Sequence, residues 1–175
     1  MVRTTEARGE ARTPAVPFAP DPGQGPRVYP LADASYSGRP DTLPAAMLDG
    51  APGTGWSNGF YKAPTALLPA FSGAREADWV SVDWGRARDF TRVEVSFTVD
   101  ATHSLPAAVG VSVWDGDRYA PVPEAAVAWA DGSDTPTVIT FAAVRGSRLR
   151  LDLTSRYPGE ERGAVRISRL ETPAA

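Results

Sequence analysis

Among the side chains that most often carry out catalysis, this 175-residue chain has one histidine, 21 carboxylates and no cysteine. A single histidine, His103, excludes a histidine-based metal cluster, and the lack of cysteine excludes thiolate metal sites and cysteine nucleophiles. The chain has neither a Gly-x-Ser-x-Gly nucleophile elbow nor a phosphate-binding glycine-rich loop that ends in Lys-Ser/Thr. A glycosidase needs two carboxylates across a cleft, and residue types alone do not place such a pair. We therefore expect no enzymatic activity from this domain.

The charge pattern argues against nucleic acid as a partner, and the lengths of the apolar stretches argue against a membrane span. The net charge is −3, and Lys62 is the only lysine among cations that are otherwise arginines. No run of basic residues interleaves with aromatic residues, so nucleic acid is not an expected partner. No apolar stretch approaches the roughly 20 residues that cross a bilayer, and the first residues lack the apolar segment of a signal peptide. The domain is expected to be extracellular if it belongs to a longer, secreted chain.

The chain divides into a tail and one domain. Residues 1–29 are rich in Pro, Gly, Ala and charged residues and carry almost no large apolar side chains. Such a segment cannot bury enough surface to offset the entropy of ordering, so it is predicted to be a disordered linker or an added tail. Residues 30–173 are long enough to form one domain with its own core.

Period-two alternation dominates the predicted domain. Apolar residues alternate with polar ones along residues 80–84, 93–99, 109–113 and 149–153, and this pattern is typical of antiparallel strands with one buried face. The dipeptide Asp115-Gly116 predicts a hairpin, and a helical turn is expected at Leu43–Leu48. The pattern predicts a sandwich of two antiparallel sheets. The predicted core contains Val82, Val93, Val95, Val111, Leu149, Leu151 and Ile167.

Short segments match, in order from residue 31 to residue 172, the motifs of a known family. They are Ala34–Ser37, Pro44–Gly50, Thr54–Ser57, Asp78–Gly85, Arg92–Val95, Ser147–Leu151 and Val165–Glu171. The chain thus resembles the galactose-binding-like domains, also called discoidin or factor 5/8 type C domains. This resemblance implies a jelly-roll β-sandwich. The family includes carbohydrate-binding modules attached to glycoside hydrolases, as well as discoidin domains that bind lipids or proteins.

The resemblance also implies where a ligand would bind. In the family, ligands lie on loops at one end of the sandwich, and the matching loops here are Ser37–Thr42, Trp56–Phe71, Asp100–Pro106 and Ser155–Gly163. A sugar needs an aromatic face for its C–H groups and planar polar groups for its hydroxyls. The candidate ligand-binding residues on these loops are Arg39, Asn58, Tyr61, His103, Arg156 and Tyr157. Each of them alone is also an ordinary loop residue.

The expected function is that of a non-catalytic carbohydrate-binding module, an accessory domain of a glycoside hydrolase. Its partners would be a carbohydrate and a covalently linked hydrolase domain. The alternative is a structural or protein-interaction domain of the same fold that binds no sugar. A membrane-binding discoidin domain ranks behind both, because exposed apolar spikes beside basic residues are scarce.

Many carbohydrate-binding members of the family hold a structural calcium ion, and Asp49 and Thr54 match part of that site. The position expected to carry its glutamate aligns with Arg169, although Glu171 would be the ligand if the alignment slipped. We expect no metal. Instead, a bulge between Ile167 and Leu170 is predicted to turn Arg169 inward, so that its guanidinium binds the Asp49 carboxylate.

Overall fold

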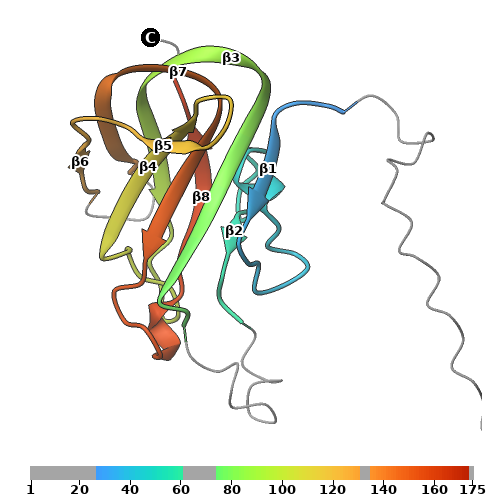
Figure 1. Ribbon diagram of the computed structural model, residues 1–175. Helices are drawn as coiled ribbons and strands as arrows, with labels where there is room; N and C mark the ends of the chain where they lie inside the picture. Colours follow the sequence, from blue (N-terminus) through green and yellow to red (C-terminus); the bar gives the residue numbers. More distant parts are fainter. Residues whose placement is uncertain (1–26, 61–73, 131–134, 174–175) are drawn as a thin grey trace, which may run out of the picture.

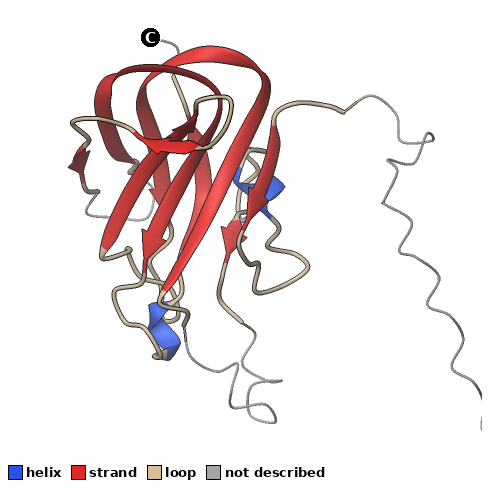
Figure 2. Cartoon of the chain, in the orientation of Figure 1, coloured by secondary structure: helices blue, strands red, loops and turns tan. Residues whose placement is uncertain are grey.

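The computed structural model of the protein describes residues 27–60, 74–130 and 135–173. Almost all regular structure in these residues is β-strand (Figure 2). The strands are β1 (Leu31–Ala34), β2 (Trp56–Ser57), β3 (Ala77–Phe97), β4 (Ala108–Trp114), β5 (Tyr119–Pro121), β6 (Ala126–Ala128), β7 (Thr137–Thr154) and β8 (Arg166–Glu171). Short 3-10 helices occur at η1 (Pro44–Met47) and η3 (Glu161–Gly163). The all-β prediction is confirmed.

The two long strands, β3 and β7, build both layers of the fold. All strand pairs are antiparallel, in the order β2-β8-β3-β7-β4-β5, with β1 on β3 and β6 on β7. Residues 77–83 of β3 pair with β1 and with residues 148–154 of β7, whereas residues 92–97 of β3 pair with strands of the other layer. Both strands arch over at one end, so the sheet folds onto itself (Figure 1). The predicted sandwich is confirmed, with its two layers joined through β3 and β7.

The arch of β3 and β7, called here the bend, depends on glycine. The pairing register of the two strands shifts between Asp83 and Arg88 of β3. Gly85 has a φ of +70°, and a Cβ atom there would lie 2.7 Å from the Tyr29 ring. A Cβ atom on Gly146 would overlap a Val113 methyl group. Side chains at these two positions are therefore incompatible with the bend.

The core lies between the two layers. Its members include all seven residues predicted from the alternation, each of which is at most 5% exposed: Val82, Val93, Val95, Val111, Leu149, Leu151 and Ile167. The core prediction is confirmed. Trp56 is also fully buried, and its Nε1 donates a hydrogen bond to the Tyr36 carbonyl at 2.9 Å. This tryptophan therefore serves packing rather than ligand contact.

Three local predictions are confirmed as well. The expected helical turn is η1, and the Asp115-Gly116 hairpin joins β4 to β5. The register of β3 against β8 slips between Ser96 and Phe97, which leaves Ser168 as the extra residue of a bulge in β8.

No helix in the described part of the chain is long and apolar enough to cross a membrane. The predicted tail falls largely outside the described residues, because residues 1–26 belong to none of the described ranges. Its disorder and the domain boundary at residue 30 therefore stay predictions.

Candidate functional site

The candidate ligand loops gather at the end of the sandwich opposite the bend (Figure 1). Ser104 N–H donates to the Ala164 carbonyl at 2.9 Å, and Asn58 N–H donates to the Val165 carbonyl at 3.2 Å. Gly38 N–H donates to the Ser57 carbonyl at 2.8 Å. These bonds fasten four segments to one another. We call this surface the loop end and define it by the described residues 37–42, 56–60, 98–107 and 155–165.

A buried carboxylate, Asp78, anchors the loop end. Its side chain is only 1% exposed, because Asp78 lies on the same face of β3 as the buried residues Val80 and Val82. It accepts hydrogen bonds from Ser35 Oγ at 2.6 Å, from Asn58 Nδ2 at 2.9 Å and from Arg75 Nε at 2.9 Å. A buried charge is tolerated when it is paired and hydrogen-bonded, as it is here. Asp78 thereby ties the start of β3 to the ends of β1 and β2.

Asn58 is one of the predicted ligand-binding residues, and its amide makes internal hydrogen bonds. The residue is 8% exposed. Its Nδ2 donates to Asp78, and its Oδ1 accepts the Val165 N–H at 2.7 Å. One end of the amide therefore holds the end of β2 against the start of β3, and the other end holds it against the residue before β8. This placement favours a positioning role, and a direct contact with ligand stays a prediction.

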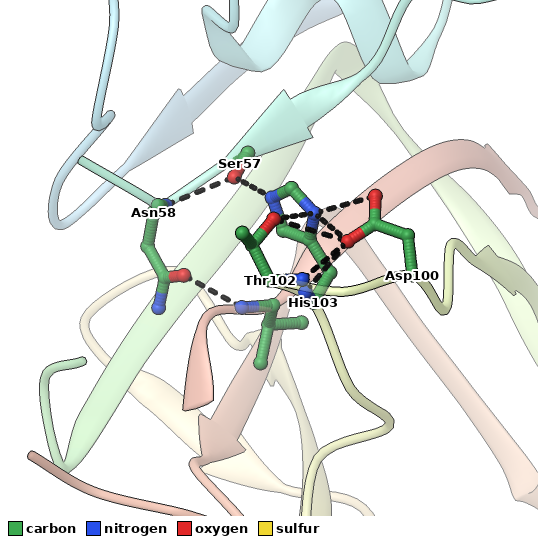
Figure 3. Close-up of polar contacts among 7 residues, drawn as sticks. Ser57, Asn58, Asp100, Thr102 and His103 are labelled. Carbon is green, nitrogen blue, oxygen red and sulfur yellow. Dashed lines mark hydrogen bonds and ion pairs between the residues drawn. The ribbon is translucent and has the colours of Figure 1, made fainter. Parts of the chain in front are cut away.

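His103 lies in the middle of a hydrogen-bonded chain (Figure 3). Its Nδ1 is 2.9 Å from the Asp100 carboxylate, and its Nε2 is 2.9 Å from Ser57 Oγ. Asp100 also accepts the backbone N–H groups of Thr102 and His103, each at 2.8 Å. A proton on Nδ1 directed at Asp100 leaves Nε2 to accept from the Ser57 hydroxyl. The ring is thus held in one orientation and one tautomer.

The order Asp100–His103–Ser57 matches that of a hydrolase triad, but the serine is not placed for nucleophilic attack. Ser57 is 2% exposed, whereas a nucleophile must be open to its substrate. Its Oγ also accepts the Gly59 N–H at 2.9 Å. The hydrogen-bonded chain therefore acts as a clamp that holds the loop between β3 and β4 against β2. Sequence reasoning identified His103 but missed Ser57 and Asp100.

The clamp predicts a pH dependence of stability. Burial raises the pKa of Asp100, but hydrogen bonds from Thr102 and His103 outweigh burial and lower that pKa to about 2. Because the pKa is lower in the folded state than in the unfolded state, ionised Asp100 favours folding. This stabilisation is complete above pH ~4 and is lost as the pH falls through the folded-state value.

We therefore expect the wild-type melting temperature to fall more steeply than that of an Asp100→Asn variant between pH 4 and pH 2. Circular dichroism melts over this interval measure the difference. An Asp117→Asn variant, altered on the exposed turn between β4 and β5, is the control and should follow the wild type. Parallel curves for wild type and Asp100→Asn would contradict the role assigned to the clamp.

The remaining predicted ligand-binding residues differ in whether their side chains already have partners within the protein. Arg156 is exposed and makes no hydrogen bond or ion pair with any described residue. The Tyr157 ring next to it lies 3.8 Å from the Arg162 guanidinium, which stacks on the ring. Arg39 forms an ion pair with Asp41 on the surface. Tyr61 lies outside the described residues.

The calcium site implied by the family can be tested on the Asp49 turn. Asp49 Oδ1 accepts from Ala51 N–H and from Thr54 Oγ1, each at 2.8 Å. Among the described residues, no group of three or more His, Cys, Asp or Glu side chains could hold a metal ion. A guanidinium, that of Arg166, enters the turn and donates to the Gly53 carbonyl at 2.5 Å. One carboxylate beside a fixed cation fits calcium poorly, because calcium is held by several oxygen ligands that include carboxylates.

The pairing expected between Arg169 and Asp49 is wrong. Arg169 is exposed and donates to Glu171 Oε1 at 2.6 Å, so Glu171, the alternative calcium ligand, is also occupied by a cation. The predicted bulge does exist, but its extra residue is Ser168. Arg169 therefore pairs with Ser96 and returns to the outward phase, while Leu170 pairs with Val95 in the core. Arg166 is the arginine that reaches the Asp49 turn.

The fold of this chain is similar to that of several solved structures. One is the β-galactosidase BgaA of Streptococcus pneumoniae (TM-score 0.65, 13% identity, 83% of this chain and 97% of that chain). Another is the module CpGH89CBM32-5 of Clostridium perfringens in complex with GalNAc-β-1,3-galactose (TM-score 0.60, 16% identity, 81% and 92%). A third is the family 32 carbohydrate-binding module of C. perfringens NanJ in complex with galactose (TM-score 0.58, 14% identity, 82% and 92%).

These identities are low, so the structural likeness demonstrates the shared β-sandwich fold alone. None of the curated protein sequences matches the chain. A family model does match: that of the F5/8 type C domain, over residues 32–167, which is most of the chain and nearly all of its sandwich. The chain belongs to the F5/8 type C domain family.

Proposed function

We propose that this domain is a non-catalytic carbohydrate-binding module that captures neutral sugars at the loop end. The observation that carries the proposal is that a free guanidinium and a fixed imidazole both belong to this one surface. Arg156 has no partner among the described residues, and His103 is held by Asp100 and Ser57. Family membership supports the proposal, as do the sugar complexes of the similar C. perfringens modules.

Each side chain has a distinct role in this proposal. Arg156 presents a rigid fork of donors to two neighbouring sugar hydroxyls, and the Tyr157 ring packs against the C–H groups of the sugar. The His103 ring, whose two nitrogens are engaged in the clamp, supplies a fixed wall of the site through its C–H edge, and Arg39 adds a polar group to the rim. Asn58 positions the loops of the loop end through its internal hydrogen bonds to Asp78 and Val165. Because the clamp fixes the imidazole before ligand arrives, little side-chain entropy is lost on binding.

The biological role that we propose is reversible capture of a glycan for a linked glycoside hydrolase outside the cell. A tethered module raises the local concentration of substrate at a catalytic domain without taking part in the reaction. Reading the coding region on either side of this domain tests the linkage. A flanking hydrolase domain supports it, and a coding region without one removes the accessory role.

The binding prediction concerns Arg156→Ala. This change should weaken binding of GalNAc-β-1,3-galactose or galactose by about 1–3 kcal/mol, which is the cost of leaving sugar hydroxyls unpaired in the complex. The melting temperature should stay unchanged, because Arg156 makes no hydrogen bond or ion pair with the described residues. Isothermal titration calorimetry measures the affinity. Arg118→Ala removes an exposed arginine from the β4–β5 turn at the other end of the sandwich and is the matched control.

The same experiment distinguishes the alternative function. If Arg156→Ala and Arg118→Ala bind these sugars equally well, the site is not at Arg156. If the wild type binds no sugar, the structural or protein-interaction role takes over. His103→Gln should also weaken binding, because a flexible amide replaces the fixed ring.

A further inference from the structure

The end of the sandwich that holds the bend carries a hollow surface, well away from the loop end. Two adjoining hollows there, of about 720 and 550 Å³, share Pro30, Trp84 and Arg88 in their walls. The larger one is also lined by Tyr29 and Arg86. We call this surface the bend hollow. Each of the two volumes is in the range of pockets that hold small ligands.

Strand β3 supplies the main wall as it leaves the core and turns through the bend. Val80 and Val82 are fully buried, and Phe90 is buried again after the bend. Between them, Trp84, Arg86 and Arg88 line the hollow. One strand therefore presents an indole and two guanidinium groups at alternate positions, where the opposite layer no longer covers them.

Three of the lining residues, Tyr29, Trp84 and Arg88, are held by contacts within the protein. The Tyr29 ring rests directly on Gly85, where a Cβ atom would lie 2.7 Å from the ring. Arg88 donates to the Thr172 carbonyl at 2.9 Å, and its guanidinium lies 5.2 Å from the centre of the Trp84 ring. Stacking on an aromatic ring and hydrogen bonding together hold a guanidinium in one place. These three residues thus form a preorganised part of the bend hollow, beside the exposed Arg86.

The balance of charge in the bend hollow is positive. Asp89 is paired with Arg145 at 3.0 Å, and Glu171 is paired with Arg169 at 2.6 Å. Glu94 is likewise paired, with Arg92 at 2.7 Å. Arg86, in contrast, makes no hydrogen bond or ion pair with any residue that the structure describes. Each carboxylate of the lining is neutralised, so an unpaired guanidinium determines the local charge.

We propose that the bend hollow is a second binding site, which takes acidic saccharides through their uronate carboxylates. Arg86 pairs with the carboxylate, since a guanidinium offers two parallel N–H donors to its two oxygens. Trp84 and Tyr29 supply the aromatic surface against which the C–H face of a pyranose packs. A saccharide fits this surface better than an acidic peptide does. The Tyr29 and Trp84 rings line the same hollow as the Arg86 guanidinium, so one uronate residue can place its C–H face on a ring and its carboxylate on the arginine. The site lies beyond the neutral-sugar function proposed for the loop end and does not depend on it.

The test is calorimetric titration of the whole domain with tri-galacturonate at about 50 mM salt, where charges are only partly screened. Arg86→Gln should weaken this binding about tenfold or more, as expected for loss of a charged hydrogen-bonded pair. It should leave binding of neutral galactotriose unchanged. Arg118→Gln removes the same charge from the same end of the sandwich but outside the hollow, and it should change the affinity for tri-galacturonate less than about twofold.

Three results would overturn the proposal. One is the absence of tri-galacturonate binding by the wild type, and another is an equal loss in Arg86→Gln and Arg118→Gln, which would indicate attraction by overall charge. The third is equally tight, Arg86-dependent binding of a tetra-glutamate peptide, which would exclude specificity for sugar. Binding of tri-galacturonate that depends on Arg86, in a protein that ignores neutral sugars, would support this site and contradict the function proposed for the loop end.

Discussion

Asp78→Ala is expected to lower the free energy of unfolding by about 2–6 kcal/mol, because two polar groups lose their buried acceptor at a cost of about 1–3 kcal/mol each. The Asp78 carboxylate is 1% exposed and accepts from Ser35, Asn58 and Arg75. Without it, the Asn58 amide and the Ser35 hydroxyl lose their acceptor inside the protein, where water does not replace it. The ends of β1 and β2 would also lose their link to β3, so sugar binding at the loop end should fall as well.

Urea denaturation measures this loss, and the chain offers a matched control on the same strand. Asp83 faces outward, is 23% exposed and pairs with Arg148 on the surface. Asp83→Ala should cost at most about 1 kcal/mol, because partly exposed ion pairs contribute little. Equal losses for the two aspartates would contradict the anchoring role of Asp78.

Leu151→Ala is expected to cost about 2–5 kcal/mol, the usual range for truncation of a buried leucine. Leu151 is fully buried in β7 and pairs with Val80 of β3 on one side and with Val111 of β4 on the other. A cavity at this position would remove contacts from three strands of one layer and from the facing layer. The surrounding strands are fixed by hydrogen bonds, so the cavity cannot fully collapse.

Leu43→Ala is the matched control for this truncation. Leu43 is 53% exposed, so the same chemical change there should alter the free energy of unfolding by less than about 0.5 kcal/mol. Chemical denaturation of both variants gives the comparison. If Leu151→Ala is as stable as Leu43→Ala, the core assigned to the sandwich is wrong.

The sandwich and its core could be predicted from the sequence because both follow from local alternation. The alternation around Val93 and Val95, and around Leu149 and Leu151, predicts a buried face even when the neighbouring strands are unknown. The position of Asp78 in this alternation also predicts burial. It stands two residues before Val80, in the phase of the core, and a carboxylate in that phase indicates a buried, paired charge.

The hydrogen-bonded clamp at the loop end could not be predicted from the sequence, because it depends on contacts between residues far apart in the chain. Ser57 and His103 are 46 residues apart, and only the packing of the loop between β3 and β4 against β2 brings them together. The same limit explains the error at Arg169. Broken alternation showed that β8 has a bulge, but which residue is extra depends on the register with β3, and that residue is Ser168. A shift of one position reverses the direction of the side chain.

The most direct test of the proposed function is the binding of the purified wild-type domain to a broad glycan array. We predict binding to glycans with neutral sugar termini, and the same spots should lose signal with Arg156→Ala and keep it with Arg118→Ala. An array on which the folded wild-type domain binds no neutral glycan would contradict the account of the loop end as a sugar-binding surface.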